Sequence, residues 1–513
     1  MSQPQLNPAI ERLYREAEEA WENQAYQKSI SLIEKATRKE PQNPSLLLNL
    51  ARAYGRRYDY PSAERYIKKA LQISTNRVHT LGEAGKTCME FDNFDMALTY
   101  LQRASQNEGV TIGALVTLAD VYFRDKRIDE GAALIARAAQ LDRKDPRVFL
   151  EEAILTRLRG NVSQAESLFR DVLKNPASNS SVRIRALYDL ASILDGDGRY
   201  DEAMSTLLEV KALLLPHAGP YTATLQHMQN RAKEMEQSIT TAVMDRWRAD
   251  LAQLQPARRI ALLCGHPRSG TTLLEQVLDA HSDITSAEET KLMHDEAYLP
   301  LIRDFSEGTS VLDSLDSVPL NIIRRARENY FRCMELFLHR KIGNRLLVDK
   351  NPSLNLMIPM VVRAFPETKF LVALRDPRDV VISCFMQALP LTPISSAYLT
   401  IEGTVNQYVN VLGFWLEMLP RMGNQWMHVR YEEMIEDLPS VARSTLEFLG
   451  VGYEEQVLKF YEHARTKRVT SPSHADVQKP LYKTARGRWR NYQKYLEPYM
   501  GALEPFLKTF NYV

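Results

Sequence analysis

A repeat of 34 residues is the feature of this 513-residue chain that most constrains its fold. Through the first 215 residues, small side chains recur every 34 positions, with a final step of 38, and a second small residue follows each twelve positions later. The first set comprises Ala17, Ala51, Gly85, Ala119, Ala153 and Ala191, and the second comprises Ser29, Ala63, Ala97, Gly131, Ala165 and Ala203. Two helices that cross closely need small residues at the crossing, because larger side chains force the backbones apart. The repeat therefore predicts six helix pairs in an all-α array.

Helix pairs with this period and this placement of small residues resemble the tetratricopeptide repeat (TPR). We expect a TPR solenoid over residues 8–215, with an extended turn at residues 175–181, where the last step is longer. Stacked repeats bury a continuous core between neighbours and leave a concave groove. The groove is expected to dock an acceptor or a partner protein. The alternative of a spacer or dimerisation element stays open, as does the oligomeric state.

After residue 258, short apolar runs alternate with amphipathic helical stretches. The runs cover residues 260–264, 346–348, 370–374 and, more weakly, 426–429, and the helical stretches include 272–281 and 380–386. Uninterrupted short apolar runs are typical of buried parallel strands, and ligands gather at the carboxyl ends of such strands. The pattern predicts an α/β domain with a parallel sheet over residues 258–513. Residues 216–257 hold a polar helical stretch, 222–251, between prolines and predict a connecting or capping helix.

Composition and charge narrow the class of protein further. The formal net charge is +1, which gives no overall argument for a nucleic-acid or membrane partner. No apolar run approaches the length of a membrane span, and the N-terminal residues lack the apolar core of a secretion signal. The four cysteines lie far apart and in no metal-binding spacing. We expect a soluble, cytoplasmic protein without a metal site.

The strongest local signal is a glycine-containing loop between the first apolar run and a helix. It comprises Gly265, His266, Pro267, Arg268, Ser269, Gly270, Thr271 and Thr272. Backbone N–H groups at the end of this loop would point at an anion on the helix N-terminus, and the arginine and the hydroxyls add charge and donors. The glycine spacing matches a Walker A loop, but Thr271 stands where that loop has its lysine. Kinase or ATPase chemistry is therefore disfavoured.

A second segment, residues 370–383, ends an apolar run in Arg-Asp-Pro-Arg-Asp and continues as a helix. Together the two segments resemble the sulfotransferases that use 3'-phosphoadenosine-5'-phosphosulfate (PAPS) as donor. The resemblance implies a P-loop-like fold, a 5'-phosphosulfate site at residues 265–272 and a 3'-phosphate site at Arg375 and Ser383, with no metal. An arginine fork matches phosphate geometry, and a helix hydroxyl would complete the site.

Two further segments are similar to the tyrosylprotein sulfotransferase subgroup. Glu-Glu-Thr-Lys at 288–291 corresponds to the Glu-Glu-Thr-Arg of that subgroup and implies that Glu289 is the catalytic base, with Lys291 keeping the charge but not the planar fork. Lys-Asn-Pro at 350–352 resembles the Lys-Asp-Pro of the subgroup and implies that Lys350 stabilises the leaving phosphate. Arg268 completes the predicted catalytic set. By their residues alone, Glu288 and Glu289 would be a solvated acidic pair that opens a helix, and Lys350 could equally be a surface lysine at the end of a strand.

Residues 471–489 resemble the segment that covers the nucleotide in this family. The resemblance implies that Ser473 and Arg488 bind the donor, and Lys479 belongs to the same basic cluster. The alternative of a basic surface stays open for Arg486 and Arg490.

The sequence as a whole predicts transfer of a sulfuryl group from PAPS to a hydroxyl of a large acceptor, either a protein tyrosine or a glycan or other hydroxylated molecule. The TPR array would recruit the acceptor or a partner. One alternative is a TPR scaffold that binds an adenosine bisphosphate without catalysis. The other is a nucleotide kinase, which the missing Walker lysine disfavours.

Overall fold

The computed structural model describes residues 7–22, 24–302, 309–466 and 486–512. The chain divides into two compact units, Met1–Asp197 and Gly198–Val513. The first is all helical, and the second is built around a parallel β-sheet. The predicted order of a helical-repeat unit followed by an α/β domain is confirmed.

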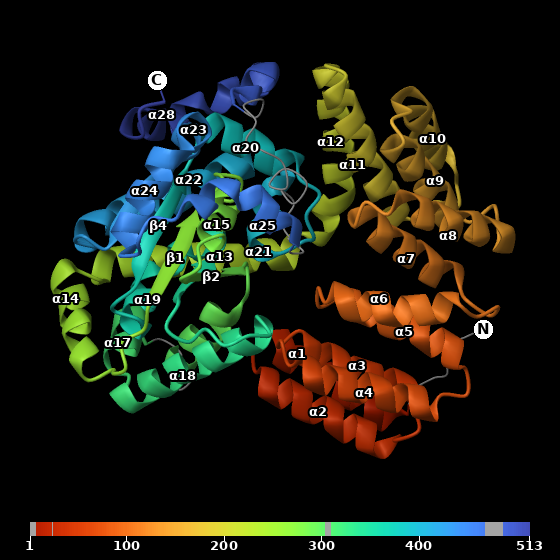
Figure 1. Ribbon diagram of the computed structural model, residues 1–513, viewed down its shortest axis with the longest axis horizontal. Helices are drawn as coiled ribbons and strands as arrows, with labels where there is room; N and C mark the ends of the chain where they lie inside the picture. The colour runs from red at the N-terminus through yellow and green to blue at the C-terminus, as the bar shows by residue number, and fades with distance from the viewer. Residues whose placement is uncertain (1–6, 23, 303–308, 467–485, 513) are drawn as a thin grey trace. The chain divides into compact units, whose positions relative to one another are not determined.

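The first unit consists of consecutive antiparallel helices, which Figure 1 shows as stacked pairs. Its helices are α1 (Pro8–Glu22), α2 (Tyr26–Lys39), α3 (Pro44–Gly55), α4 (Tyr60–Ile73), α5 (Arg77–Met89), α6 (Phe94–Ser105), α7 (Ile112–Arg124), α8 (Ile128–Leu141), α9 (Pro146–Leu158), α10 (Val162–Lys174) and α11 (Ser180–Gly196). Many of them begin at an Asn, Asp or Thr whose side chain accepts a hydrogen bond from an N–H of the first turn, as Asn43 and Asn93 do.

The small residues of the repeat lie where helices cross. Ala51, Ala119 and Ala153 are fully buried. A Cβ at Gly85 would lie 2.4 Å from Leu101 Cγ, so even an alanine would force α5 and α6 apart. The 34-residue period of the sequence is therefore the distance along the chain between successive helix crossings.

The first helices of the pairs form one side of the solenoid. From α3 through α5, α7 and α9 to α11, each contacts the first helix of the next pair. In the described part of the chain, the second helices make no comparable contacts with one another. The first helices therefore line the concave side, because helices on the inside of a curved stack approach most closely.

The longer last step of the repeat lies in a helix and not in a turn. Helices α9 and α11 begin 34 positions apart, at Pro146 and Ser180, but α11 has 17 residues where α9 has 13. The expected extended turn at residues 175–181 is therefore wrong, because the additional residues lie within α11, between its start at Ser180 and Ala191.

Helix α12 (Tyr200–Leu214) continues the repeat pattern in sequence but belongs to the second unit. The ring of Tyr200 packs edge to face against Tyr492 at 5.5 Å, and Lys494 Nζ lies 2.7 Å from Asp201 Oδ1. The connecting stretch forms two helices, α13 (Gly219–Ser238) and α14 (Thr241–Ala249). They contact α22 (Ile401–Met418) and α19 (Ile358–Ala364) respectively. The borders at residues 215 and 257 stay predictions.

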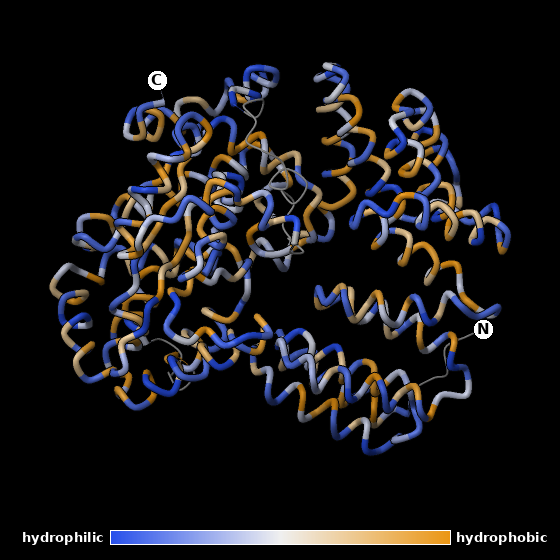
Figure 2. The backbone as a smooth tube through the Cα atoms, in the orientation of Figure 1, coloured by the Kyte–Doolittle hydropathy of each residue, from blue (hydrophilic) through white to orange (hydrophobic). Residues whose placement is uncertain are grey.

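The sheet of the second unit is five-stranded and entirely parallel, in the order β2-β3-β1-β4-β5. Its strands are β1 (Ile260–Gly265), β2 (Ile284–Glu288), β3 (Leu346–Lys350), β4 (Lys369–Leu374) and β5 (Trp426–Arg430). Figure 2 shows hydrophobic runs through the sheet, whereas the helices of the first unit alternate between hydrophobic and hydrophilic along each turn. The apolar runs predicted four of these strands, and β2 was not predicted.

Helices cover both faces of this sheet. They are α15 (Thr271–Asp279), α16 (Leu299–Ile302), α17 (Val311–Asp316), α18 (Leu320–Phe337), α19 (Ile358–Ala364), α20 (Pro377–Met386), α21 (Pro393–Ser396), α22 (Ile401–Met418), α23 (Tyr431–Glu436), α24 (Leu438–Leu449), α25 (Phe460–Thr466), α27 (Gln493–Leu496) and α28 (Met500–Thr509). Among the described residues, no helix combines the length and the apolarity needed to cross a membrane.

Candidate functional site

The predicted phosphate loop connects β1 to α15 and depends on its two glycines. Gly265 has φ +132°, and a Cβ there would lie 2.4 Å from the carbonyl oxygen of Ala373 on β4. Gly270 has φ +93°, and its Cβ would meet the ring of Tyr431 at 2.8 Å. Both positions combine a left-handed backbone with a close approach, which only glycine tolerates. The loop is thereby held in a compact turn at the carboxyl end of β1.

Two predicted motifs that are far apart in the sequence meet at Arg268. The Nε of Arg268 donates to Ser383 Oγ at 3.0 Å, across 115 residues of sequence. Arg375 Nη1 donates to the carbonyl oxygen of Arg268 at 3.2 Å, and the Arg375 guanidinium lies 4.9 Å from the centre of the Tyr431 ring. Arg375 and Ser383 are both buried. The structure therefore gathers two guanidinium groups and a hydroxyl beside the loop.

The start of α15 adds backbone donors to this cluster. Ser269, Thr271 and Thr272 are buried where the helix begins, and the Ser269 N–H closes the turn onto the His266 carbonyl oxygen at 3.2 Å. The first N–H groups of a helix have no acceptor within the helix and favour an anion. Arginines, hydroxyls and helix N–H groups together make a donor set that suits phosphate or sulfate.

His266 and Pro267 form the underside of the loop. Cys384 Sγ donates to the Pro267 carbonyl oxygen at 3.4 Å and lies 3.7 Å from His266 Nδ1. Complete burial lowers the pKa of His266 to about 4, so its imidazole is neutral near pH 7. His266 therefore supports the loop by packing and adds no charge to the site.

Lys350 and Glu289 lie side by side at the ends of adjacent strands. The register pairs Glu288 at the end of β2 with Lys350 at the end of β3. The Glu289 N–H donates to the Lys350 carbonyl oxygen at 2.8 Å, and Lys350 Nζ lies 2.8 Å from Glu289 Oε1. Lys350 is fully buried, whereas 48% of the Glu289 side chain is exposed. Glu289 also has a positive φ of 25°, a strained conformation that is concentrated at functional positions.

A second carboxylate reaches the same lysine. Glu275 Oε2, on the buried face of α15, lies 3.5 Å from Lys350 Nζ, and Ser286 Oγ donates to Glu275 Oε1 at 3.0 Å. Burial raises the pKa of Glu275, and the opposite charge of Lys350 lowers it. Burial alone would lower the pKa of Lys350, but Glu275 and Glu289 outweigh it and raise that pKa above its usual value. The lysine is therefore held as an ammonium ion.

The C-terminal candidates divide between described and undescribed residues. Arg488 opens a short 3-10 helix, Arg488–Tyr492, beside α20. The N–H groups of Gly487 and Trp489 donate to Asp379 of α20 at 2.7 and 2.9 Å. Arg488 therefore lies next to the helix that carries Ser383. Ser473 and Lys479 lie outside the described residues, and Lys291 is exposed.

Sequence reasoning missed three residues that hold the site together. Asn355 Oδ1 accepts a hydrogen bond from the Gly265 N–H at 3.0 Å, Asp379 anchors the C-terminal segment, and Glu275 contacts Lys350. Of these, only Glu275 left a signal in the sequence. It is an acid within the apolar stretch Leu-Leu-Glu-Gln-Val-Leu of α15, where a charge needs a buried partner.

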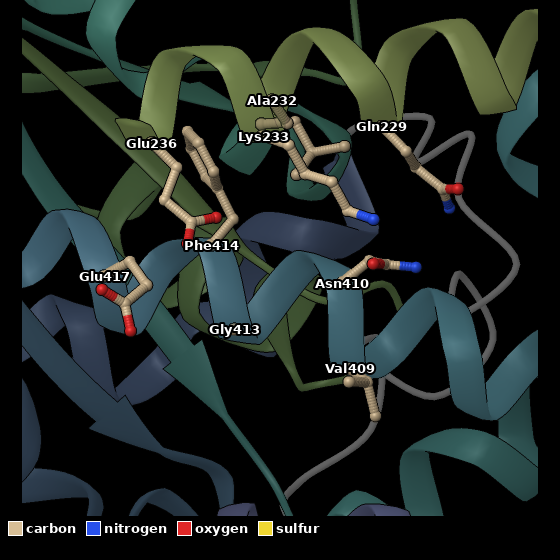
Figure 3. A pocket seen from close by; sticks show the side chains of 10 residues that line it. Gln229, Ala232, Lys233, Glu236, Val409, Asn410, Gly413, Phe414 and Glu417 are labelled. Carbon is tan, nitrogen blue, oxygen red and sulfur yellow. The ribbon is translucent and has the colours of Figure 1, made fainter. Parts of the chain in front are cut away.

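A separate cleft of about 250 Å³ lies between α13 and α22 and contains none of the predicted site residues. In Figure 3, Lys233 and Glu236 of α13 face Asn410, Phe414 and Glu417 of α22. Its lining mixes both signs of charge with an aromatic ring, so it favours no single class of ligand.

Comparison with known families identifies both units. Residues 261–455, which include the loop, Glu289, Lys350 and Arg375, match the model of the sulfotransferase family. Residues 261–455 form a sulfotransferase-family domain. Residues 14–77 and 184–213 match tetratricopeptide repeat models.

Relatives of the sulfotransferase domain include protein-tyrosine sulfotransferases. The chain is 27% identical to a putative protein-tyrosine sulfotransferase of Caenorhabditis briggsae, covering 39% of this chain and 68% of that one. It is 27% identical to the protein-tyrosine sulfotransferase of Drosophila melanogaster, covering 44% and 46%. An uncharacterized protein of Aquifex aeolicus (strain VF5) is 23% identical over 82% of this chain and 54% of its own. The chain thus spans about half the length of the Aquifex and Drosophila relatives.

Among solved structures, the sulfotransferase domain of the Synechococcus PCC 7002 olefin synthase is similar, with 21% identity. The similarity covers 46% of this chain and 89% of that one, with a TM-score of 0.34. This likeness carries no argument about function.

Proposed function

We propose that the protein transfers the sulfuryl group of PAPS to a hydroxyl of an acceptor. The observation that carries the proposal is the meeting of the loop with Arg375 and Ser383 around Arg268, beside the Lys350–Glu289 pair. In the sheet, Lys350 is in register with Leu263 of β1, so the pair and the loop share the carboxyl edge of the sheet. Ligands of parallel sheets bind at that edge.

The donor set fits a nucleotide that carries phosphates at two positions. The loop and the start of α15 would hold the 5'-phosphosulfate, and Arg375 with Ser383 would hold the 3'-phosphate. Arg268 lies between these groups through its contacts to both Ser383 and Arg375. Arg488, beside α20, would contact the nucleotide from the C-terminal side, and Ser473 and Lys479 remain proposed contacts of the same segment.

The chemistry requires a base and a cation near each other. PAPS would supply an electrophilic sulfur and a phosphate leaving group. Glu289 would accept the proton of the acceptor hydroxyl as the acceptor oxygen bonds to sulfur, which its half-exposed carboxylate permits. Lys350 would donate to the departing phosphate oxygen as its bond to sulfur breaks. A buried ammonium stabilises such charge more strongly than an exposed one, because little water screens it.

We propose further that the acceptor is large and that the TPR unit recruits it. Two of the relatives are named as protein-tyrosine sulfotransferases, which favours a protein tyrosine, with a glycan as the alternative. The concave side, lined by the first helices, offers a continuous surface for an extended acceptor.

Two measurements on the full chain test the proposal. Calorimetric titration should give a much higher affinity for 3'-phosphoadenosine-5'-phosphate than for 5'-AMP, by about ten- to a hundredfold for one charge-assisted contact. Incubation with radiolabelled PAPS and fractionated acceptor extracts should label a macromolecule. Equal affinities for the two nucleotides would overturn the donor assignment. Tight bisphosphate binding without any labelled product would favour a binding scaffold.

A further inference from the structure

Three charged side chains form a closed cluster at the ends of β2 and β3. The cluster consists of Lys350, Glu289 and Glu275, of which only Lys350 is a cation. Its Nζ lies 2.8 Å from Glu289 Oε1 and 3.5 Å from Glu275 Oε2. Lys350 and Glu275 are fully buried, so neither can exchange its partner for water. Each change of charge on one member must therefore be balanced within the cluster.

Catalysis by Glu289 would disturb this balance. When Glu289 accepts a proton from the acceptor, it loses its negative charge and ceases to be a counter-ion. A buried ammonium without a counter-ion is costly and tends to lose its proton. Lys350 is needed as an ammonium ion at that same moment, because negative charge develops on the leaving phosphate.

We propose that Glu275 is a positioning residue of the sulfuryl transfer, fixing Lys350 at the end of β3 and keeping it charged while Glu289 is protonated. The inference rests on the proposed function. Glu275 is itself placed by the Ser286 hydroxyl on β2 and by its position on α15, one turn after the phosphate loop. It therefore links the donor loop to the acid–base pair through Lys350.

Two other acids lie around the cluster. Glu288 on β2 adds negative charge near both Lys350 and Glu275, and Asp279 on α15 adds it near Glu275. Asp279, however, is held by His463 of α25 at 2.7 Å and by Arg340 at 3.6 Å. Tyr398, after α21, lies near Glu289 and carries no charge, because burial raises its pKa well above the usual value.

The test compares Glu275→Gln with the wild type in the full chain. The variant keeps the size of the side chain and an acceptor for Ser286 but has no negative charge. We expect kcat to fall about ten- to a hundredfold, as for one lost charge-assisted contact, with KM for PAPS little changed. The alkaline limb of kcat should move down by at least about one pH unit, because an adjacent opposite charge is worth that much to an ammonium ion.

One measurement without turnover separates this inference from the proposed function. As the pH is raised, the affinity for 3'-phosphoadenosine-5'-phosphate should begin to decline at a lower pH in Glu275→Gln than in the wild type.

Two further variants keep the result interpretable. Asp279→Asn removes another buried acid of α15 that does not contact Lys350, so it should lower stability without moving the alkaline limb. Ser286→Ala should shift the limb in the same direction as Glu275→Gln but by less. A Glu275→Gln enzyme with kcat within twofold of the wild type and an unmoved limb would overturn the inference. Wild-type protein without bisphosphate preference or turnover would instead overturn the proposed function.

Discussion

Each unit of this protein contains an ion pair with one buried and one partly exposed member, and the buried member differs between the Glu151–Arg185 pair and the Lys350–Glu289 pair. In the repeat unit, the buried member is an acid, Glu151 of α9, which lies 2.9 Å from Arg185 of α11. Arg185 also reaches Asp120 of α7 at 2.6 Å and is itself 39% exposed. In the sulfotransferase unit, the buried member is the cation, Lys350, and the acid Glu289 reaches solvent.

The difference separates a cluster that is closed to ligands from one whose carboxylate a substrate could reach. The Glu151 carboxylate is closed off by an arginine that joins three first helices of the solenoid, so no ligand can reach it without breaking the stack. The Lys350 cluster ends in a carboxylate that a bound hydroxyl could approach, at the same sheet edge as the loop proposed to bind the donor. Burial of charge therefore marks a candidate site only where a proton acceptor remains accessible.

The largest expected effect is on Glu289. Glu289→Gln keeps the size but cannot accept a proton, and positioned bases contribute about 10²–10⁴-fold to turnover. We expect kcat to fall by that range, the acid limb of the pH–rate profile to disappear, and bisphosphate affinity to stay near normal. Glu288→Gln is the matched control and should cost much less. A larger loss of kcat in Glu288→Gln than in Glu289→Gln would mean that the base is assigned to the wrong carboxylate.

Arg375 should have the next largest effect, on donor selectivity. Arg375→Lys keeps the charge but loses the fork, so the preference for the bisphosphate over 5'-AMP should fall about ten- to a hundredfold in titration. Arg378→Lys is the control, because Arg378 pairs with Asp376 at 2.7 Å and stacks on Trp489. If Arg375→Lys prefers the bisphosphate over 5'-AMP as strongly as the wild type does, Arg375 does not bind the 3'-phosphate.

The repeat cluster should affect stability and not catalysis. Burial raises the pKa of Glu151 to about 8, against an ordinary 4.5. Its contribution to stability is therefore present below pH 4.5 and lost as the pH rises through 8, at up to about 1.4 kcal/mol per pH unit. Glu151→Gln should flatten the pH dependence of thermal unfolding while bisphosphate affinity and kcat stay unchanged. A loss of kcat in Glu151→Gln would mean that the cluster of the repeat unit also affects catalysis, which contradicts the distinction between the two clusters.

The smallest effect is expected on the concave side of the repeats. Lys86 lies on the first helix α5, with its side chain 35% exposed, and Lys68 lies on the second helix α4. Lys86→Glu should change KM for a macromolecular acceptor about two- to fivefold, the usual worth of one surface charge pair, without changing bisphosphate affinity. Lys68→Glu should change neither. Equal effects of the two variants would argue against recruitment along the first helices.

The sequence missed particular elements for identifiable reasons. Strand β2 reads Ile-Thr-Ser-Ala-Glu, with few large apolar residues, and is buried only because β3 and α15 cover it. Helix α12 has the small-residue pattern of a repeat, yet it belongs to the second unit, where Tyr200 and Asp201 contact the C-terminal helices. Both depend on partners that are distant in the chain, which local patterns do not report.

Local patterns by themselves determined the helix pairs, four strands of the sheet, the phosphate loop and the motif ending in Ser383. Local patterns suffice for these features because hydrophobic periodicity, glycine placement and helix capping each depend on residues that are close together in the sequence. Only the tertiary structure decided that Arg268 meets Ser383 and Arg375, and that Glu275 shares Lys350 with Glu289. These contacts join segments that lie up to 115 positions apart. Parallel strands bring such segments to one edge of the sheet. A charge buried at that edge is stable only where a side chain of opposite charge from another segment lies beside it.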